Sequence, residues 1–169
     1  MEVGIDIVDL DRIEKVYNRY GVKFLQRFLS EEEIAVCMHK PQVIASVAGR
    51  FAAKEAVVKA LGTGFSGEVH WKSFEILNDE RGRPFVRPAA AGCFPSGCSI
   101  KISIAHDRHS AVATALIDRV LKPGESDRDI PCCCLDKKKA GVTYHTPAFF
   151  LKRCSDIRRC EPELVSLLR

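Results

Sequence analysis

Apolar residues at the start of the chain alternate with polar or small ones, which is the spacing of a β-strand. Over residues 2–8, Val3, Ile5 and Ile7 share one face, and Asp6 lies on the other. The sequence therefore predicts a first strand whose two faces differ in chemistry.

Helical signals follow this strand. Acidic residues at 9–11 suit the N-terminal end of a first helix, and residues 22–29 read as a second, short helix. A Ser-x-x-Glu capping box at 30–33 begins a third helix. Pro41 suits the first turn of a long helix that runs to about Leu61.

The second half of the chain returns to strand spacing. Turn residues at 79–84 and at 106–109 separate the strands. One strand, then helices, then a strand meander indicates an α+β fold rather than α/β, with the meander packed against the long helix and the shorter ones. The predicted strands cover residues 69–77, 84–87, 99–105 and 110–117.

Composition and charge divide the chain near residue 118. The whole sequence of 169 residues has a net charge of +4, but residues 1–118 balance to zero and residues 119–169 carry the excess. Five of the eight cysteines also fall in this last part. We therefore expect one domain over 1–118 and a disordered or irregular extension over 119–169.

The composition also narrows the class of protein. Hydrophobic content of 46% and charged content of 28% are ordinary for a globular protein. No apolar run approaches the roughly 18 residues of a membrane helix, and no signal peptide is evident at the start. These features predict a cytoplasmic protein without membrane or nucleic-acid partners.

The segment 49–64 carries the clearest chemistry. Glu55 and Lys59 are four residues apart on the long helix, so both project from one face. Gly62 and Gly64 then allow a tight turn that can offer N–H groups to an anion. These groups suit a ligand with both metal and phosphate, although a surface ion pair and a helix C-cap would have the same spacing.

A run of cations in the first helices indicates a partner surface. The cations are spaced by three or four residues and are interleaved with Phe24 and Phe28. Such a basic stripe would suit an acidic protein helix, and an ordinary solvated face is the alternative. The stripe consists of Arg12, Lys15, Arg19, Lys23 and Arg27.

Four ordered motifs, at residues 4–13, 28–33, 49–64 and 103–107, together resemble the holo-acyl-carrier-protein synthases. These enzymes are the short branch of the phosphopantetheinyl transferase superfamily. The resemblance covers residues 2–118. The Pro/Gly/Cys-rich stretch 88–98 departs from the family pattern, and residues 119–169 have no counterpart.

The resemblance implies a transferase that moves 4′-phosphopantetheine from coenzyme A to a serine of apo acyl carrier protein. Mg²⁺ would be required, and adenosine 3′,5′-bisphosphate would be released. The resemblance also implies a homotrimer with active sites between neighbouring subunits.

The resemblance assigns roles to individual residues. Asp6 and Glu55 match the metal carboxylates, and with Lys59 they form the expected catalytic set. Glu55 and a metal-bound water both remain candidates for the general base. Phosphate and nucleotide contacts fall to Lys59, Gly62, Thr63, Gly64 and His106. Carrier-protein docking falls to Arg12, Lys23 and Arg27.

Two other functions fit part of the sequence. A non-enzymatic module binding acidic proteins or RNA would use the basic stripe and leave Asp6 and Glu55 without a role. Another Mg²⁺-dependent nucleotide enzyme, such as a phosphohydrolase, would use the carboxylates and leave the basic stripe without one.

Overall fold

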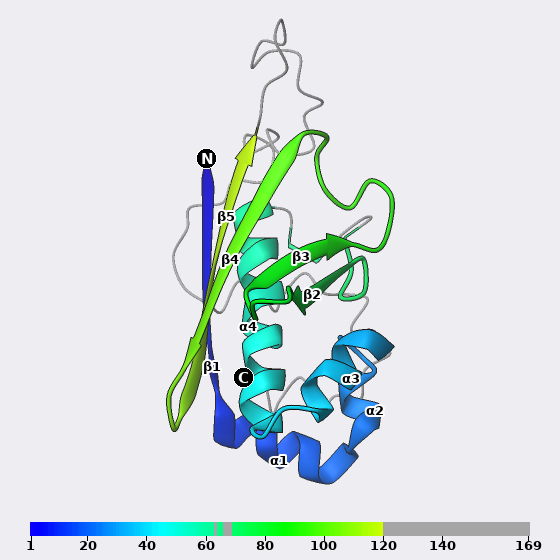
Figure 1. Cartoon of the computed structure of the whole chain (residues 1–169), viewed down its shortest axis with the longest axis vertical. Helices are drawn as coiled ribbons and strands as arrows, with labels where there is room; N and C mark the ends of the chain where they lie inside the picture. Colours follow the sequence, from blue (N-terminus) through cyan, green and yellow to red (C-terminus); the bar gives the residue numbers. More distant parts are fainter. Residues whose placement is uncertain (63, 66–68, 120–169) are drawn as a thin grey trace, which may run out of the picture.

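A long helix packed along one face of a three-stranded antiparallel sheet forms the centre of the molecule (Figure 1). The computed structural model describes residues 1–62, 64–65 and 69–119. The sheet has the strand order β1-β5-β4, and β2 and β3 form a separate two-stranded sheet. The helices are α1 (Leu10–Tyr20), α2 (Val22–Leu25), α3 (Glu31–Met38) and α4 (Val43–Leu61). The strands are β1 (Glu2–Asp9), β2 (Phe74–Asn78), β3 (Pro84–Pro88), β4 (Cys98–His106) and β5 (Ser110–Arg119).

Small residues let α4 lie unusually close to the sheet. A Cβ atom added to Gly4 of β1 would come within 1.9 Å of the backbone oxygen of Ala56 on α4. Ala113 and Ala115 of β5 are also buried on this inner face. The sheet and the helix therefore pack nearly backbone to backbone at Gly4, and the side chains beside Gly4 meet those of α4.

The opposite, outer face of the sheet is apolar and exposed. Val3, Ile5 and Ile7 are 60%, 58% and 68% exposed, and Leu116, which pairs with Val3, is 39% exposed. The prediction that Val3, Ile5 and Ile7 share a face opposite Asp6 is confirmed. The apolar face of β1 points away from the core, and the face with Asp6 points towards α4.

A completely buried ion pair connects the helical end of the molecule with the second sheet. Nζ of Lys54 on α4 lies 3.0 Å from Oε2 of Glu33 on α3. Glu33 is also the last residue of the capping box, and both reciprocal hydrogen bonds with Ser30 are present. The predicted capping box is therefore confirmed, and its glutamate has a second role in the core.

The α+β fold class is confirmed, as are most predicted elements. Asp9 caps α1 by accepting a hydrogen bond from the N–H of Arg12. The predicted long helix ends at Leu61 as expected, and Gly62 caps it in the left-handed conformation. The predicted turn at 106–109 joins β4 to β5, with Asp107 accepting hydrogen bonds from two following N–H groups.

Three predicted boundaries were wrong. The strand predicted over 69–77 begins only at Phe74, because the N–H of Ser73 donates to the carbonyl of His70 and closes a turn. The second helix ends at Leu25, where the N–H groups of Arg27 and Phe28 bond to carbonyls three residues back and interrupt the α-helical pattern. The long helix begins at Val43, two residues after Pro41.

The predicted boundary at residue 118 falls one residue before β5 ends. The extension over 119–169 lies, after Arg119, outside the described residues, so its predicted irregularity stays a prediction. Within the described ranges, no helix combines the length and the apolar character needed to cross a membrane.

The contact at Gly4 generates a stability prediction. Gly4→Ala is expected to lower the free energy of unfolding by about 3 kcal/mol or more, because α4 must move away from β1. Urea unfolding followed by circular dichroism measures this loss. Gly82→Ala is the matched control: Gly82 has a positive φ of 81° but open space around it, so its cost is about 1 kcal/mol from backbone strain. Equal losses for the two variants would contradict the close-packing argument.

Candidate active site

Asp6 and Lys59 meet where β1 lies against the C-terminal half of α4. Nζ of Lys59 is 2.6 Å from Oδ1 of Asp6 and 3.1 Å from the backbone oxygen of Ile5. Asp6 reaches the helix because it shares the inner face of β1 with Gly4, and Lys59 reaches the strand because it lies one turn beyond Glu55. The structure thus joins two candidates that are 53 residues apart in the sequence.

Glu55 completes a compact acidic pair with Asp6. Burial and, to a smaller extent, the negative charge of Asp6 raise the pKa of Glu55 to about 7, against the lowering effect of Lys59. Burial likewise raises the pKa of Asp6, against the lowering effect of Lys59. Two carboxylates in a poorly solvated place share one ammonium, so a second positive charge would stabilise both ionised forms.

This donor set fits a magnesium ion. Mg²⁺ binds hard carboxylate oxygens, needs only one or two of them from the protein, and takes its other ligands from water and substrate phosphates. Among the described residues, no group of three or more His, Cys, Asp or Glu side chains could hold a metal. The two carboxylates with raised pKa values therefore favour a cation that shares its coordination with a substrate over a fully protein-bound metal.

The glycine turn after α4 has the predicted backbone. Gly62 and Gly64 have φ values of 72° and 68°, which L side chains rarely adopt. The N–H of Gly62, however, donates to the carbonyls of Val58 and Lys59. The helix end uses this N–H, as the C-cap alternative predicted, and contact of the turn with an anion stays a prediction. Thr63 lies outside the described residues.

Three aromatic rings next to the acidic pair were not assigned to the site from the sequence. Phe51 precedes Glu55 by four residues on α4, so it lies on the same face. Trp71 lies 5.0 Å from the Phe51 ring and is stacked on Phe65 at 3.9 Å between centroids. These ring contacts show Trp71 as a packing residue. The i, i+4, i+8 spacing of Phe51, Glu55 and Lys59 was the available signal.

His106 lies away from this group within the subunit. It ends β4 and pairs with Ala111 of β5, which in turn pairs with Val8 of β1. Two strand spacings, about 10 Å, separate β4 from β1. His106 lines a cavity of about 380 Å³ beside the N-terminal half of α4, together with Lys40 and Arg50. A single subunit therefore does not bring His106 to Asp6 and Glu55.

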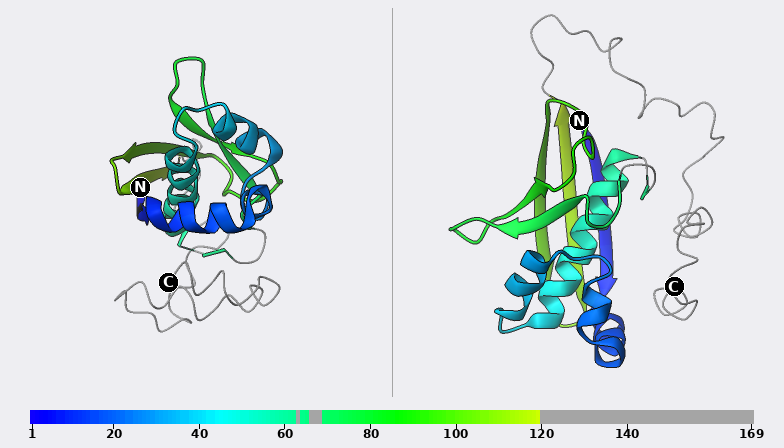
Figure 2. Two further views of the ribbon diagram at one scale, coloured as in Figure 1. Left: turned by 90° about the horizontal axis from the view of Figure 1, so that it is seen from below. Right: turned by 90° about the vertical axis from the view of Figure 1, so that its right-hand side faces the viewer.

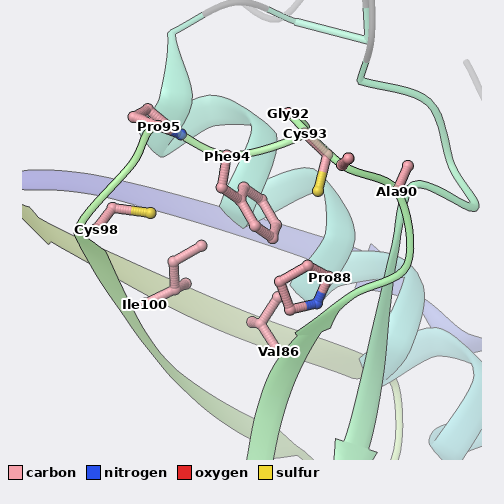
Figure 3. A pocket seen from close by; sticks show the side chains of 10 residues that line it. Val86, Pro88, Ala90, Gly92, Cys93, Phe94, Pro95, Cys98 and Ile100 are labelled. Atoms are coloured by element: carbon pink, nitrogen blue, oxygen red, sulfur yellow. The ribbon is translucent and has the colours of Figure 1, made fainter.

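The atypical stretch 88–98 encloses a different cavity, of about 350 Å³ (Figure 3). Phe94 projects into it between Cys93 and Cys98, and Val86 and Ile100 lie across from the loop. None of the 10 lining residues is charged. This cavity does not have the chemistry of a phosphate site.

The three docking candidates are exposed at the helical end of the molecule, Arg12 on α1, Lys23 on α2 and Arg27 just after it. Phe24 and Phe28, in contrast, are only 2% and 3% exposed. The expected interleaving of aromatic rings with the basic stripe is therefore wrong, because both rings pack in the core. The two phenylalanines therefore contribute nothing to this surface.

Comparisons with known proteins identify the family of this chain. The model of the 4′-phosphopantetheinyl transferase superfamily matches residues 2–116. The holo-[acyl-carrier-protein] synthase of Pelodictyon phaeoclathratiforme is 81% identical over 120 residues, which are 71% of this chain and 100% of that protein. The corresponding synthase of Chlorobium phaeovibrioides is 66% identical over 117 residues, 69% of this chain and 94% of that protein.

Solved structures give the same result. The holo-(acyl-carrier-protein) synthase of Bacillus anthracis, in complex with CoA (3′,5′-ADP), is 37% identical with a TM-score of 0.61, covering 70% of this chain and 96% of its own. The Helicobacter pylori enzyme in complex with coenzyme A is 36% identical with a TM-score of 0.61, covering 69% of this chain and 99% of its own. The chain belongs to the holo-[acyl-carrier-protein] synthase family of the 4′-phosphopantetheinyl transferase superfamily and is a transferase.

Proposed function

We propose that this protein transfers 4′-phosphopantetheine from coenzyme A to a serine of apo acyl carrier protein in a Mg²⁺-dependent reaction that releases adenosine 3′,5′-bisphosphate. The observation that carries the proposal is the convergence of Asp6, Glu55 and Lys59, two carboxylates and one ammonium, in a chain of this family. A binding module would have no use for the two carboxylates, whose pKa values are raised by burial.

Asp6 and Glu55 would hold the metal. When bound there, Mg²⁺ would neutralise the negative charge of the diphosphate and of the leaving group. Lys59 is 41% exposed at its side chain, so its ammonium can turn from Asp6 to a phosphate oxygen. The same lysine would then orient the diphosphate for in-line attack.

Glu55 is a suitable proton acceptor. In the metal-free protein its pKa is about 7, and a bound Mg²⁺ would lower that value, so the carboxylate would be ionised and able to accept a proton at neutral pH. In the proposed step the serine hydroxyl gives its proton to the carboxylate, and its oxygen forms a bond to the β-phosphorus. The bond from that phosphorus to the bridging oxygen breaks, and adenosine 3′,5′-bisphosphate leaves with the electron pair.

The exposed cations at the helical end form the proposed docking surface for the carrier. Arg12, Lys23 and Arg27 lie on or just after α1 and α2, and a strongly acidic carrier would be drawn to them by long-range attraction. Because Phe24 and Phe28 are buried, we expect the encounter to be mainly electrostatic and sensitive to salt.

We further propose that three copies assemble through the outer face of the sheet. Val3, Ile5, Ile7 and Leu116 form an exposed apolar surface of the kind that a partner covers. Assembly would also explain the position of His106, because a neighbouring copy could bring the cationic cavity of His106, Lys40 and Arg50 to Asp6 and Glu55. The cytoplasmic location stays a prediction.

A transfer assay tests the proposed function. The protein is incubated with coenzyme A, Mg²⁺ and apo acyl carrier protein, and both the carrier mass and the nucleotide product are measured. We expect the carrier to gain one phosphopantetheine and adenosine 3′,5′-bisphosphate to appear. Asp6→Asn and Glu55→Gln should each lower the rate by about 100-fold or more, because metal affinity and charge balance are lost.

Arg81→Glu, on the exposed turn between β2 and β3, serves as the control and should retain normal activity. Cleavage of coenzyme A without a gain in carrier mass would contradict the proposed transfer and would indicate hydrolysis instead. Full activity in either carboxylate variant would remove the site assignment.

The raised pKa of Glu55 predicts pH-dependent metal binding. Protonation removes the charge of Glu55 as the pH falls through about 7, so Mg²⁺ affinity should fall about tenfold per pH unit below that value. Isothermal titration calorimetry from about pH 6 to about pH 8 measures this change in Mg²⁺ affinity. Glu55→Gln should bind Mg²⁺ weakly and without this dependence. An affinity that is constant from pH 8 to pH 6 would contradict the assignment of Glu55 as a ligand.

The assembly proposal predicts the effect of one outward-facing substitution. Ile7→Lys should convert the trimer to monomers, since a charge would be buried in the interface, and should abolish transfer while the circular dichroism spectrum is unchanged. Light scattering after size-exclusion chromatography measures the mass. Phe85→Lys, at another exposed apolar side chain, is the control and should leave the mass unchanged. An active monomeric Ile7→Lys protein would rule out intersubunit sites.

A further inference from the structure

The buried pair of Lys54 and Glu33 has no part in the proposed chemistry, yet its hydrogen bonding is complete. Nζ of Lys54 lies 3.0 Å from Oε2 of Glu33 and donates to the backbone oxygens of Trp71, at 2.6 Å, and Phe74, at 2.8 Å. An ammonium has three hydrogens to donate. These three acceptors use all of them.

Both carboxylate oxygens of Glu33 also accept hydrogen bonds from the backbone. Its Oε1 accepts a hydrogen bond from the N–H of Ile76 at 2.8 Å, and its Oε2 accepts one from the N–H of Ser30 at 2.8 Å. The pair therefore ties α3 and α4 to β2 and to the turn that precedes β2. Figure 2 shows that these elements come together on the side of α4 away from the three-stranded sheet.

Stability alone does not account for this pair. Moving two charges out of water is costly, and replacing a buried ion pair with apolar residues is often neutral or stabilising. A buried pair can instead select one geometry among several compact ones. Here the selected geometry is that of the segment 71–74, because the carbonyls of Trp71 and Phe74 must both point at one ammonium.

Trp71 extends this constraint to the candidate active site. Its ring is stacked on Phe65, with 3.9 Å between centroids, and lies 5.0 Å from the ring of Phe51. Phe51 is one helical turn before Glu55 on the same face of α4, and Phe65 directly follows Gly64. We call Phe51, Phe65 and Trp71 the aromatic wall. It adjoins Glu55 through Phe51 and the glycine turn through Phe65.

We infer that Lys54 is a positioning residue: through the carbonyls of Trp71 and Phe74 it holds the aromatic wall, and with it the glycine turn, in the geometry that accepts coenzyme A. The identity of the ligand rests on the proposed function, whereas the effect on the wall does not. Lys54 immediately precedes Glu55 in the sequence. Its ammonium, however, points to Glu33 on a different side of the helix.

The test replaces both partners, so that no lone charge is buried, in the variant Glu33→Gln/Lys54→Met. Trp71 is the single tryptophan of the chain, so its fluorescence reports on the wall directly. We expect a cooperative urea transition, a red-shifted emission that iodide quenches more strongly, and a KM for coenzyme A raised about tenfold or more. The kcat should change much less, because lost ground-state binding appears in KM.

Asp79→Asn/Arg83→Met is the control. It removes another carboxylate–cation pair, in the turn between β2 and β3 with 3.6 Å between Arg83 Nε and Asp79 Oδ2. We expect normal emission and a normal KM for this variant. A folded Glu33→Gln/Lys54→Met protein with wild-type emission and KM would overturn the inference.

Phe65→Leu gives a second test if that double variant fails to fold. It removes the stacked ring without touching the ion pair, and the KM for coenzyme A should again rise about tenfold. An unchanged KM in this variant would overturn the inference. Absence of transfer by the unaltered protein would instead contradict the proposed function, and the Trp71 emission of the double variant would then decide the positioning role.

Discussion

The close approach of α4 to β1 at Gly4 is the contact on which the rest of the structure depends. With hydrogen as the side chain, the strand can lie almost directly on the backbone of Ala56, which a Cβ would meet at 1.9 Å. The neighbouring side chain on that face is Asp6, and the helix offers Lys59 and Glu55 at the same level. Any residue larger than glycine would separate the helix from the strand and the carboxylates from each other.

Two lysines of α4 lie on different sides of the helix and in different surroundings. On one side, Lys54 is wholly buried and is satisfied by Glu33 and two carbonyls. On the other, Lys59 is partly exposed and pairs with Asp6. The first lysine is fixed and the second can exchange partners, because water reaches only the second. Two lysines five residues apart on one helix thus have different physical roles.

Much of the fold was predictable because its signals are local. Strand alternation, the capping box at Ser30 and Glu33, and the terminal glycine of α4 each act within a few residues. The errors arose where distant contacts override local preference. Residues 69–73 have the spacing of a strand, but their backbone turns so that Trp71 can reach the ammonium of Lys54, and no local pattern contains that information.

The site was predictable in part for the same reason. Glu55 and Lys59 are neighbours on one helix, so their spacing showed the pair, whereas the link to Asp6 came from the family resemblance and not from any local pattern. The burial of Phe24 and Phe28, in contrast, depends on the packed molecule. In the proposed assembly, the position of His106 relative to Asp6 and Glu55 depends on a neighbouring subunit.

The alternation of β1 has one more consequence, for its pairing with β5. A slip of β1 by a single residue would turn Ile5 and Ile7 onto the helix and Asp6 into solvent, since side chains change face with every position. It would also move a bulkier neighbour into the place of Gly4, where no Cβ fits. The strand therefore has one permitted alignment, fixed by steric exclusion at Gly4.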